Sequence, residues 1–584
     1  MKKLIRKISV LAISVMCALS SYACSFKGSL PDEEDIDPLR TQIHVFNFNG
    51  GYGSDWLMKA KARFEDLHKD DVYEEGKKGV QIVINNDKTG IAALEPLILD
   101  GEDEIYFTEY VSNYYSLINS GIIADITDAV QADMSAYGDA QGVSIESKLT
   151  KEQKEYLGVQ KDGAVRYYGI PHYAGYTGLT YNVDLFETNN YYYLNGHPEV
   201  PDVQDFDTFE NELGTSISDY FVLTKDEKRS AGPNGEYGDY DDGLPATYAE
   251  FYFLCERISR DNGVIPVLWN GKNNADYLGG LMHALVTNYE GLEQMMLHYN
   301  FDGTAVDLGT IQDGKFVEDE TDTVITSENG YELSRQAGKY YALEFLERII
   351  SNPSYWYSKQ EKAFNTAYTH LNAQRDFING GIDGKTSSMA MLVDGCWWQS
   401  EAKQSFTDMV NSKGEQYSQE NRNFAFMPLP KANADKLDEK NVLNDHIYSM
   451  CFMKSNVAEW KKPLALDFIK FCYSDESLVE FTTTTNAVKA LNYKLDADAL
   501  EQMTPYGRSL VEVKENSTVV YPYSSNEFFL NKQSSFTMFQ LYKSEISAGY
   551  EEQYYATAKR IYSTSAEDYF SGLHKYWSRT WSLL

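Results

Sequence analysis

Short strand-like runs alternate with helix-like stretches from residue 41 onward, and this alternation limits the possible folds more than any other feature. Residues 42–48, 80–84 and 104–107 are predicted as strands, and a helix is predicted over 92–99. An apolar helical face is also predicted after the first strand, made by Trp56, Leu57, Ala60, Phe64 and Leu67. Strands that alternate with helices form parallel β-α-β units, so an α/β fold follows.

Two loops follow these predicted strands and are candidate ligand-binding edges. Ligands of parallel α/β sheets bind beyond the carboxyl ends of the strands, where the connecting loops gather. The first loop is the glycine-rich segment 49–53, and the second covers residues 108–110. Both are therefore expected to contact a ligand.

The size and charge of the chain restrict its organisation and its partners. A chain of 584 residues is too long for one hydrophobic core, since single cores stop growing at roughly 250–300 residues. Two large lobes are therefore expected. The net charge of −35 is spread along the chain and repels phosphate backbones, which argues against nucleic acid as a partner. Aromatic residues make up 14% of the chain, and Tyr and Trp suit half-solvated recognition surfaces.

The first residues have the order of an export signal followed by a tether. A basic start precedes an apolar run that is too short to span a bilayer, so a signal peptide is predicted over residues 1–23. Cys24 can be the lipidated first residue of a lipoprotein, tethered by residues 24–40. Alternatively, Ser21 and Ala23 can mark ordinary signal cleavage that releases a free secreted protein. We favour the lipoprotein because a polar tether follows, although the residues before Cys24 depart from the usual lipobox.

Motifs for catalysis and for metal binding are missing from the sequence. There is no H-E-x-x-H and no G-x-S-x-G, and the 9 histidines are scattered without ligand spacing. We therefore expect a protein that is not an enzyme, with no cofactor and no metal. Carboxylate pairs for glycoside hydrolysis remain open, because their spacing is spatial. The four cysteines after the leader lack C-x-x-C spacing and are expected to be buried free thiols.

An acidic, glycine-rich stretch extends from residue 198 to 245. Its end, residues 234–243, has closely spaced carboxylates that could hold Ca²⁺, but their spacing does not match an EF-hand loop. We favour an acidic surface insertion without a metal.

Five short segments carry a resemblance to a known family. In chain order they cover residues 119–127, 168–186, 245–251, 388–398 and 426–430. The second contains Tyr168-Gly169-Ile170-Pro171 and, further on, Tyr181-Asn182, and the fourth ends in Gly395-Cys396-Trp397-Trp398. Together they resemble the family 1 extracellular solute-binding proteins of ABC importers, the maltose-binding-protein group, over roughly residues 42–500. The length and the leader look more like the larger Gram-positive members, and the acidic insertion departs from the family pattern.

The resemblance implies a fold and a division of the chain. The expected fold is a two-lobed α/β clamp, of the type II periplasmic-binding-protein kind, with mostly parallel sheets, a hinge and C-terminal helices. Crossings between the lobes are expected near Ala174-Gly175 and near residues 443–450 and 485–491. Lobe 1 is expected over residues 41–175 and 443–490, and lobe 2 over residues 176–442 and 491–584.

The resemblance also implies a set of ligand-binding residues. A sugar pocket stacks aromatic rings on the C–H face of the sugar and places carboxylates, amides and hydroxyls at its rim. The residues expected to bind ligand are Asn47, Asn49, Tyr52, Phe107, Glu109, Tyr110, His172, Tyr173, Tyr176, Trp269, Asp394, Trp397 and Trp398. Asn270, Asn444, Asp445 and His446 are further candidates. Neighbouring side chains point in different directions, so one of Trp397 and Trp398 is expected to face ligand and the other to be buried.

These features predict the extracellular solute-binding component of an ABC importer. It would capture a mono- or oligosaccharide by hinge closure and deliver it to a membrane permease. The expected partners are a sugar, the transmembrane permease subunits and the membrane, which it contacts through a lipid anchor only, and the protein is expected to be a monomer. A secreted carbohydrate-active enzyme and a surface glycan adhesin remain alternatives, as does a peptide or cationic ligand.

Overall fold

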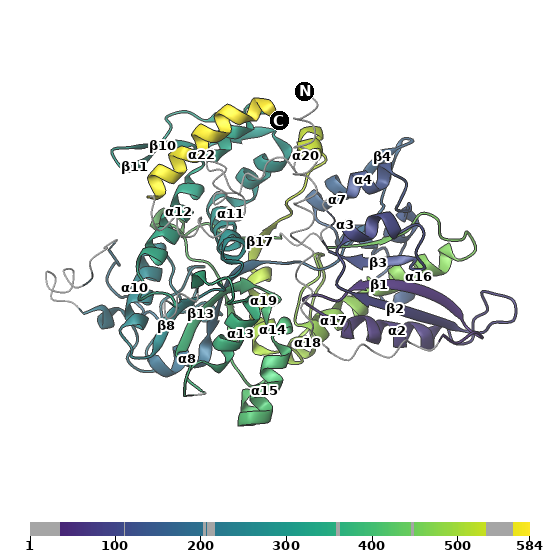
Figure 1. Cartoon of the computed structure of the whole chain (residues 1–584), viewed down its shortest axis with the longest axis horizontal. Helices are drawn as coiled ribbons and strands as arrows, with labels where there is room; N and C mark the ends of the chain where they lie inside the picture. Colours follow the sequence, from purple (N-terminus) through teal and green to yellow (C-terminus); the bar gives the residue numbers. More distant parts are fainter. Residues whose placement is uncertain are drawn as a thin grey trace.

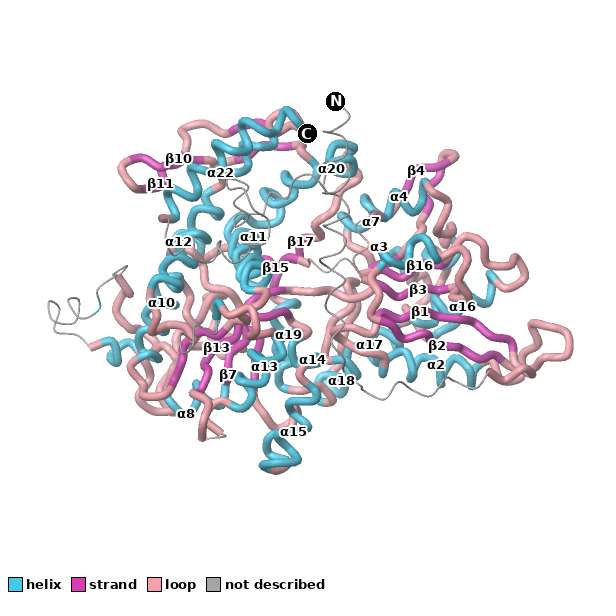
Figure 2. Tube along the Cα trace, in the orientation of Figure 1, coloured by secondary structure: helices cyan, strands magenta, loops and turns pink. Residues whose placement is uncertain are grey.

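Two α/β lobes lie side by side in the computed structural model, each built on its own sheet (Figure 1). The structure describes residues 36–109, 111, 113–201, 206, 216–357, 363–382, 384–445, 449–532 and 565–584. Figure 2 shows the strands gathered into two main groups, one on each side of the view. Within the described ranges no strand belongs to both main sheets, which confirms the expected two-lobed α/β class.

The sheet of the first lobe, here called sheet 1, combines early strands with one from far along the chain. Its order is β2 (Val80–Asp87), β1 (Thr41–Phe48), β3 (Ile105–Thr108), β16 (Met450–Met453) and β6 (Ile170–Pro171). β1 pairs in parallel with β2 and β3, as the β-α-β pattern predicts. β16 runs antiparallel to both of its neighbours, so the sheet is mixed.

Helix α2 (Asp55–Leu67) packs its expected apolar face inside the first lobe. Phe64 contacts Phe468 and Phe471 from α16 (Lys462–Cys472), with ring centroids 5.0 and 5.3 Å apart. Leu67 departs from expectation, because it is 58% exposed. The buried place one turn beyond Phe64 is taken by His68, whose ring lies 4.3 Å from that of Phe64.

The helix expected over 92–99 is shorter and irregular. It consists of α3 (Ile91–Leu94) and a 3₁₀ turn, η1 (Glu95–Leu97). Pro96 lies in that turn and has no backbone N–H to continue an α-helical ladder, which explains the change.

The sheet of the second lobe, sheet 2, is also mixed. Its order is β14 (Phe424–Met427), β7 (Thr177–Asn182), β13 (Ser388–Gly395) and β8 (Val264–Leu268). β7 runs antiparallel to both neighbours, whereas β13 and β8 are parallel. Every residue of β7 is buried, and seven of the eight in β13, which is typical of a central strand covered on both faces.

Several helices surround sheet 2 and complete the second lobe (Figure 1). They include α8 (Val183–Asn189), α10 (Tyr248–Ser259), α11 (Asn274–Asn300), α12 (Ala337–Ser351), α13 (His370–Asn379), α14 (Trp398–Glu401), α15 (Lys403–Lys413) and α19 (Pro505–Glu515). α10 begins within the family-like segment 245–251, and the Thr247 hydroxyl accepts a hydrogen bond from the Glu250 N–H at 3.3 Å. α11 bends at Gly291, whose φ is 73°.

Among the described residues, the chain passes between the lobes at 172–176, on both sides of the gap that follows Asp445 and precedes Ser449, and at 486–491, and these parts lie against one another. The N–H of Tyr173 donates to the Ser449 hydroxyl (2.9 Å), and the N–H of Ala174 donates to the Val488 carbonyl (3.0 Å). The third crossing follows α17 (Asp475–Thr485) and leads to α19, which packs on β14. The lobe boundaries expected at residues 175, 442 and 490 remain proposals.

The expected C-terminal helices are present. They comprise α18 (Ala497–Glu501), α19, α20 (Glu527–Lys532) and α22 (Ala566–Thr580). α22 lies along α12 at the edge of the second lobe, in yellow in Figure 1. Strand β17 (Ser517–Val520) interrupts this series and pairs in parallel with β15 (Asn441–Asn444).

The amino-terminal leader lies outside the described residues, and with it the expected signal peptide and Cys24. Within the part of the chain that the structure describes, no helix combines the length and the apolar character needed to cross a membrane.

Candidate ligand-binding site

The loop after β1 is held in shape by the side chain of Asn47. Its amide nitrogen donates to the Asn86 side-chain oxygen (3.0 Å) and to the Gly53 carbonyl (3.4 Å). Gly51 and Gly53 adopt positive φ values of 45° and 72°, which glycine tolerates best. Asn47 is buried and Asn49 is half-buried, so the first amide supports the loop and the second lies at its surface.

Tyr52, in this loop, contacts the second lobe. Its hydroxyl lies 3.2 Å from the Cys396 sulfur, and its ring packs edge-on against Tyr173 with centroids 4.8 Å apart. A Cβ placed on Gly51 would lie 3.7 Å from the Cβ of Trp397. Burial raises the pKa of the Tyr52 hydroxyl well above its usual value, so this group is neutral. The two lobes therefore meet where β1 and β13 end.

Cys396 is the centre of this contact, and sequence reasoning did not assign it to the site. It was expected to be a buried free thiol, which it is, but its sulfur also accepts a hydrogen bond from the Tyr176 N–H at 3.3 Å. The Cys396 N–H donates in turn to the Tyr176 carbonyl at 2.8 Å. Burial raises the pKa of the Cys396 thiol to about 11, so it is protonated at neutral pH. Its position within the family-like segment 388–398 was the one feature of the sequence that could have pointed to a role in the site.

His172 is surrounded by aromatic rings and bonded to a buried lysine. Its Nδ1 lies 2.5 Å from the Lys489 ammonium nitrogen, and the rings of Trp56 and Phe107 are each 5.0 Å away. Burial lowers the His172 pKa well below its usual value and lowers that of Lys489 to about 7. A neutral imidazole that accepts from Lys489 fits both shifts. Neither Lys489 nor Trp56 was predicted as a ligand-binding residue. Trp56 was assigned only to the apolar face of a helix, and residue 489 only to an expected crossing.

Tyr173 has a backbone fixed by hydrogen bonds and a buried hydroxyl. Its carbonyl accepts from the Ser449 hydroxyl at 2.7 Å. Its own hydroxyl is buried and forms no hydrogen bond with the described residues. Glu109 is also buried, and its charge is one of those that raise the pKa of Tyr52, which places it near this cluster. Tyr110 lies outside the described residues.

Asp394 ends β13 inside a small polar network. Its Oδ1 accepts from the Gly395 N–H (2.7 Å) and its Oδ2 from the Gln374 amide (3.1 Å). That amide also donates to Glu401 Oε2 at 3.0 Å. Burial, with the Glu401 charge second, raises the Asp394 pKa well above its usual value. The protonated carboxyl therefore persists to higher pH than an exposed aspartic acid would.

The two adjacent tryptophans have opposite environments. Trp398 is 0% exposed, and its ring centroid lies 5.5, 5.3 and 5.4 Å from those of Phe377, Phe424 and Tyr506. Trp397 is half-buried and lies over Gly395, where a Cβ would come 2.2 Å from its ring. Trp398 thus belongs to the core, and Trp397 lies where the lobes meet.

Trp269 is not brought to this cluster. It is fully buried, its indole N–H donates to the Ala363 carbonyl at 2.9 Å, and its ring packs near Trp356 and Phe364. Asn270 beside it accepts from the Asn273 N–H at 2.7 Å. Of the other further candidates, Asp445 accepts from the Gly175 N–H at 2.9 Å in the second crossing, whereas His446 lies outside the described residues.

Comparison with known proteins adds a likeness of fold. Neither a family model nor a curated protein sequence matches this chain. A solved structure from a study of xylan utilization by the thermophilic bacterium Caldanaerobius polysaccharolyticus is similar at a TM-score of 0.50. The two are 11% identical, and the alignment covers 92% of this chain and 99% of the other.

Two further solved structures align over most of their length. A chitin oligosaccharide binding protein has a TM-score of 0.49 and 13% identity, and apo RafE of Streptococcus pneumoniae has a TM-score of 0.49 and 12% identity. Each alignment covers 93% of this chain and 99% of the other. At such low identity the likeness to the Caldanaerobius structure is one of fold alone.

Proposed function

We propose that this protein is the extracellular solute-binding component of an ABC importer. It captures a carbohydrate by closing its two lobes and delivers it to a membrane permease, acting as a monomer and not as an enzyme. The observation that carries the proposal is the contact of Tyr52 with Cys396 beside the three crossings. Both residues lie in loops at the carboxyl ends of strands, and a hinge of a few residues lets such lobes open and close.

The chemistry of the contact supports a sugar as the ligand. Trp397 offers a half-buried ring to a C–H face, and Asp394 has a carboxyl at the same edge. The Tyr173 hydroxyl has no hydrogen-bond partner among the described residues. Rings combined with a few fixed polar groups are what saccharide recognition needs. Asn49, Tyr176 and Glu109 complete the wall that we propose.

A thermal-shift screen with a glycan panel tests the proposal. The panel includes xylo-oligosaccharides, because the fold neighbour at a TM-score of 0.50 comes from a study of xylan utilization. A ligand that binds only the folded state raises Tm, and calorimetry then gives Kd. Chromatography of the recovered saccharide should show it unchanged. The proposal fails if no saccharide raises Tm while peptides or polyamines do, or if the saccharide is cleaved.

Export and anchoring form a separate part of the proposal. We expect Cys24 to carry lipid, because a basic start, an apolar run and a polar tether surround it in that order. Cys24→Ser should release the protein from the cell surface into the medium, measured by fractionation and blotting. Mass spectrometry of the mature amino terminus provides the control. An unmodified terminus at Cys24 or later would show a freely secreted protein instead.

A further inference from the structure

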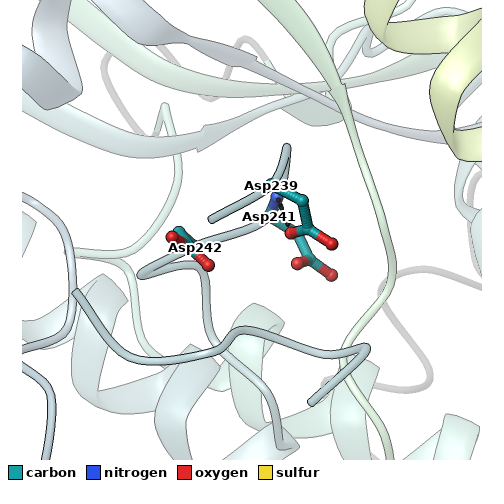
Figure 3. A group of neighbouring side chains, drawn as sticks. All are labelled: Asp239, Asp241 and Asp242. Atoms are coloured by element: carbon teal, nitrogen blue, oxygen red, sulfur yellow. Dashed lines mark hydrogen bonds between the residues drawn. The ribbon is translucent and has the colours of Figure 1, made fainter. Parts of the chain in front are cut away.

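The acidic turn of the second lobe brings three carboxylates together (Figure 3). Asp239, Asp241 and Asp242 each contribute one oxygen, and these oxygens lie within 4.8 Å of one another. The sequence favours a surface insertion here, but Asp241 is 0% exposed. The chain folds back on itself through glycines of positive φ, including Gly232 and Gly243, and this brings the middle of the turn inside.

The turn itself holds Asp241 and Asp242 through one carboxylate oxygen each, and it holds Asp239 through both, since the Asp241 N–H donates to Asp239 Oδ1 at 3.4 Å. The Asn234 N–H donates to Asp241 Oδ2 (3.1 Å), and the Asn234 amide donates to Asp239 Oδ2 (2.6 Å). The Gly238 N–H donates to Asp242 Oδ2 at 2.9 Å. These bonds fix the orientation of all three side chains before any ion is added.

The second oxygens of Asp241 and Asp242 lack donors among the described residues. Oδ1 of Asp241 and Oδ1 of Asp242 are buried and receive no hydrogen bond from the described residues. A buried carboxylate oxygen without a donor is unfavourable, because it has lost water and gained no partner. The Asp239 carboxylate lies beside these two, so three negative charges are crowded together and a cation would relieve their repulsion.

We propose that Asp239, Asp241 and Asp242 bind one Ca²⁺ ion. The donor set is entirely oxygen, which suits a hard cation, and the cluster contains no His or Cys ligand for zinc. Ca²⁺ accepts six to eight oxygens in irregular arrangements, whereas Mg²⁺ demands a smaller, nearly octahedral set. The ion supplies the partner that the buried Oδ1 atoms of Asp241 and Asp242 lack among the described residues.

The position of the site indicates what the ion does. The Tyr193 N–H donates to the Gly243 carbonyl at 2.8 Å, and the Ser230 N–H donates to the Tyr193 carbonyl at 2.9 Å. The turn is thus joined to the chain that follows β7 and α8, and it leads directly to the Thr247 cap of α10. Ca²⁺ fastens the acidic insertion to the second lobe, independently of the transport function proposed above.

The test uses the full chain after removal of divalent ions with a chelator. Terbium is the luminescent probe, because Tyr240 lies between two of the ligands and can sensitise it. Calorimetry with CaCl₂ should show one ion per chain. Millimolar Ca²⁺ should raise Tm by about 2 °C or more over the chelated protein, and Mg²⁺ at the same concentration should not. An equal response to Mg²⁺ would contradict the assignment.

Matched variants separate this site from general surface charge. Asp241→Asn should abolish the Ca²⁺-dependent rise in Tm, whereas Glu236→Gln removes the same charge from an exposed position of the same turn and should preserve it. If Asp241→Asn does not fold, Asp242→Asn should weaken Ca²⁺ binding by at least about tenfold, since fewer charged ligands mean lower affinity. The proposal is overturned if both acids can be replaced without effect. It is also overturned if Ca²⁺ leaves the parent unchanged while Asp241→Asn melts higher, which would identify a shared proton.

Discussion

At the scale of single residues, neighbours in sequence have different tasks. Trp397 and Trp398 follow each other at the end of β13, and a turn of the chain at this point directs their rings apart. The ring of Trp398 fills a space among Phe377, Phe424 and Tyr506, whereas that of Trp397 covers Gly395 beside the first-lobe loop. One ring is therefore expected to serve stability and the other affinity.

Replacement of each tryptophan by alanine should separate these roles. Trp397→Ala should melt close to the parent and lose about 1–3 kcal/mol of binding free energy for the cognate saccharide, the value of a large stacking ring. That loss is about one to two decades in Kd. Trp398→Ala should lose about 3–5 kcal/mol of folding stability through its cavity. Calorimetry of melting and of binding checks both, and unchanged affinity in Trp397→Ala would remove it from the site.

Lys489 shows how one buried amine sets a pH dependence. Its nitrogen faces His172 from the first crossing, Cys451 from β16, and Cys472 and Tyr473 at the end of α16. Burial lowers its pKa to about 7, whereas an unfolded lysine titrates near 10.4. Between these values the unfolded chain binds the extra proton, so this residue makes stability rise with pH from about 7 to about 10.

The Lys489→Met variant should lose this rise. Relative to the variant, the parent should gain roughly 1 kcal/mol of unfolding free energy or more between pH 7.5 and pH 9, because each unit of pH contributes up to about 1.4 kcal/mol. Urea denaturation at both pH values measures the difference. Lys494→Met, which changes an exposed lysine five residues further on, should keep the slope of the parent. Equal slopes in Lys489→Met and the parent would contradict the lowered pKa.

At the scale of elements, the end of β13 is shaped by one glycine. Gly395 has no room for a methyl group, since a Cβ would lie 2.2 Å from the Trp397 ring. At the end of β13 the backbone of Gly395 is therefore uncovered by a side chain, and the Trp397 ring packs directly against it. Small residues at such points serve close approach of a neighbouring group.

A double-mutant cycle tests this dependence. Gly395→Ala should displace the Trp397 ring and lower ligand affinity by about tenfold, while the melting temperature falls little. In the Trp397→Ala background the same change should cost almost nothing, because the ring it displaces is absent. Calorimetric Kd values for the four proteins give the coupling. If the losses of binding free energy from Gly395→Ala and Trp397→Ala are additive, Gly395 does not act through the Trp397 ring.

Local sequence patterns predicted the helices and strands better than they predicted the tertiary contacts between them. The strands near residues 42–48 and 80–84 were predicted because alternation and apolar runs are local signals. The inward turn of His68 in place of Leu67 depends on packing that no local pattern encodes. The antiparallel strand β16 and the Tyr52–Cys396 contact join residues hundreds of positions apart, so they required the structure.

At the scale of the whole molecule, two lobes are joined by three crossings and touch where their strands end. Cys396 lies in this contact, between the Tyr52 hydroxyl and the Tyr176 N–H. The other described cysteines, Cys255, Cys451 and Cys472, are buried within the lobes. Separation of the lobes would expose the first thiol and leave the others covered.

Alkylation should therefore report lobe opening. Without ligand, Cys396 should react slowly with iodoacetamide at alkaline pH, and a saturating cognate saccharide should slow it at least about tenfold, because the closed state is favoured by differential binding. Peptide mass spectrometry quantifies each cysteine separately. Cys255, Cys451 and Cys472 should stay unmodified in both conditions and act as internal controls. If the rate of Cys396 alkylation is the same with and without the saccharide, the lobes do not move apart.

The late position of β16 determines the order in which this protein can assemble. All four strands of sheet 2 come from residues 177–427, so that sheet is complete in one continuous stretch of chain. Sheet 1 begins earlier, at residue 41, but β3 and β6 have no partner between them until residues 450–453 arrive. Placing β16 between β3 and β6 requires closure of a chain loop that contains the whole of sheet 2. Contacts between residues so far apart in the sequence form slowly. The sheet that starts first therefore finishes last, and a chain emerging in order keeps this edge of β3 without its strand partner until its final quarter.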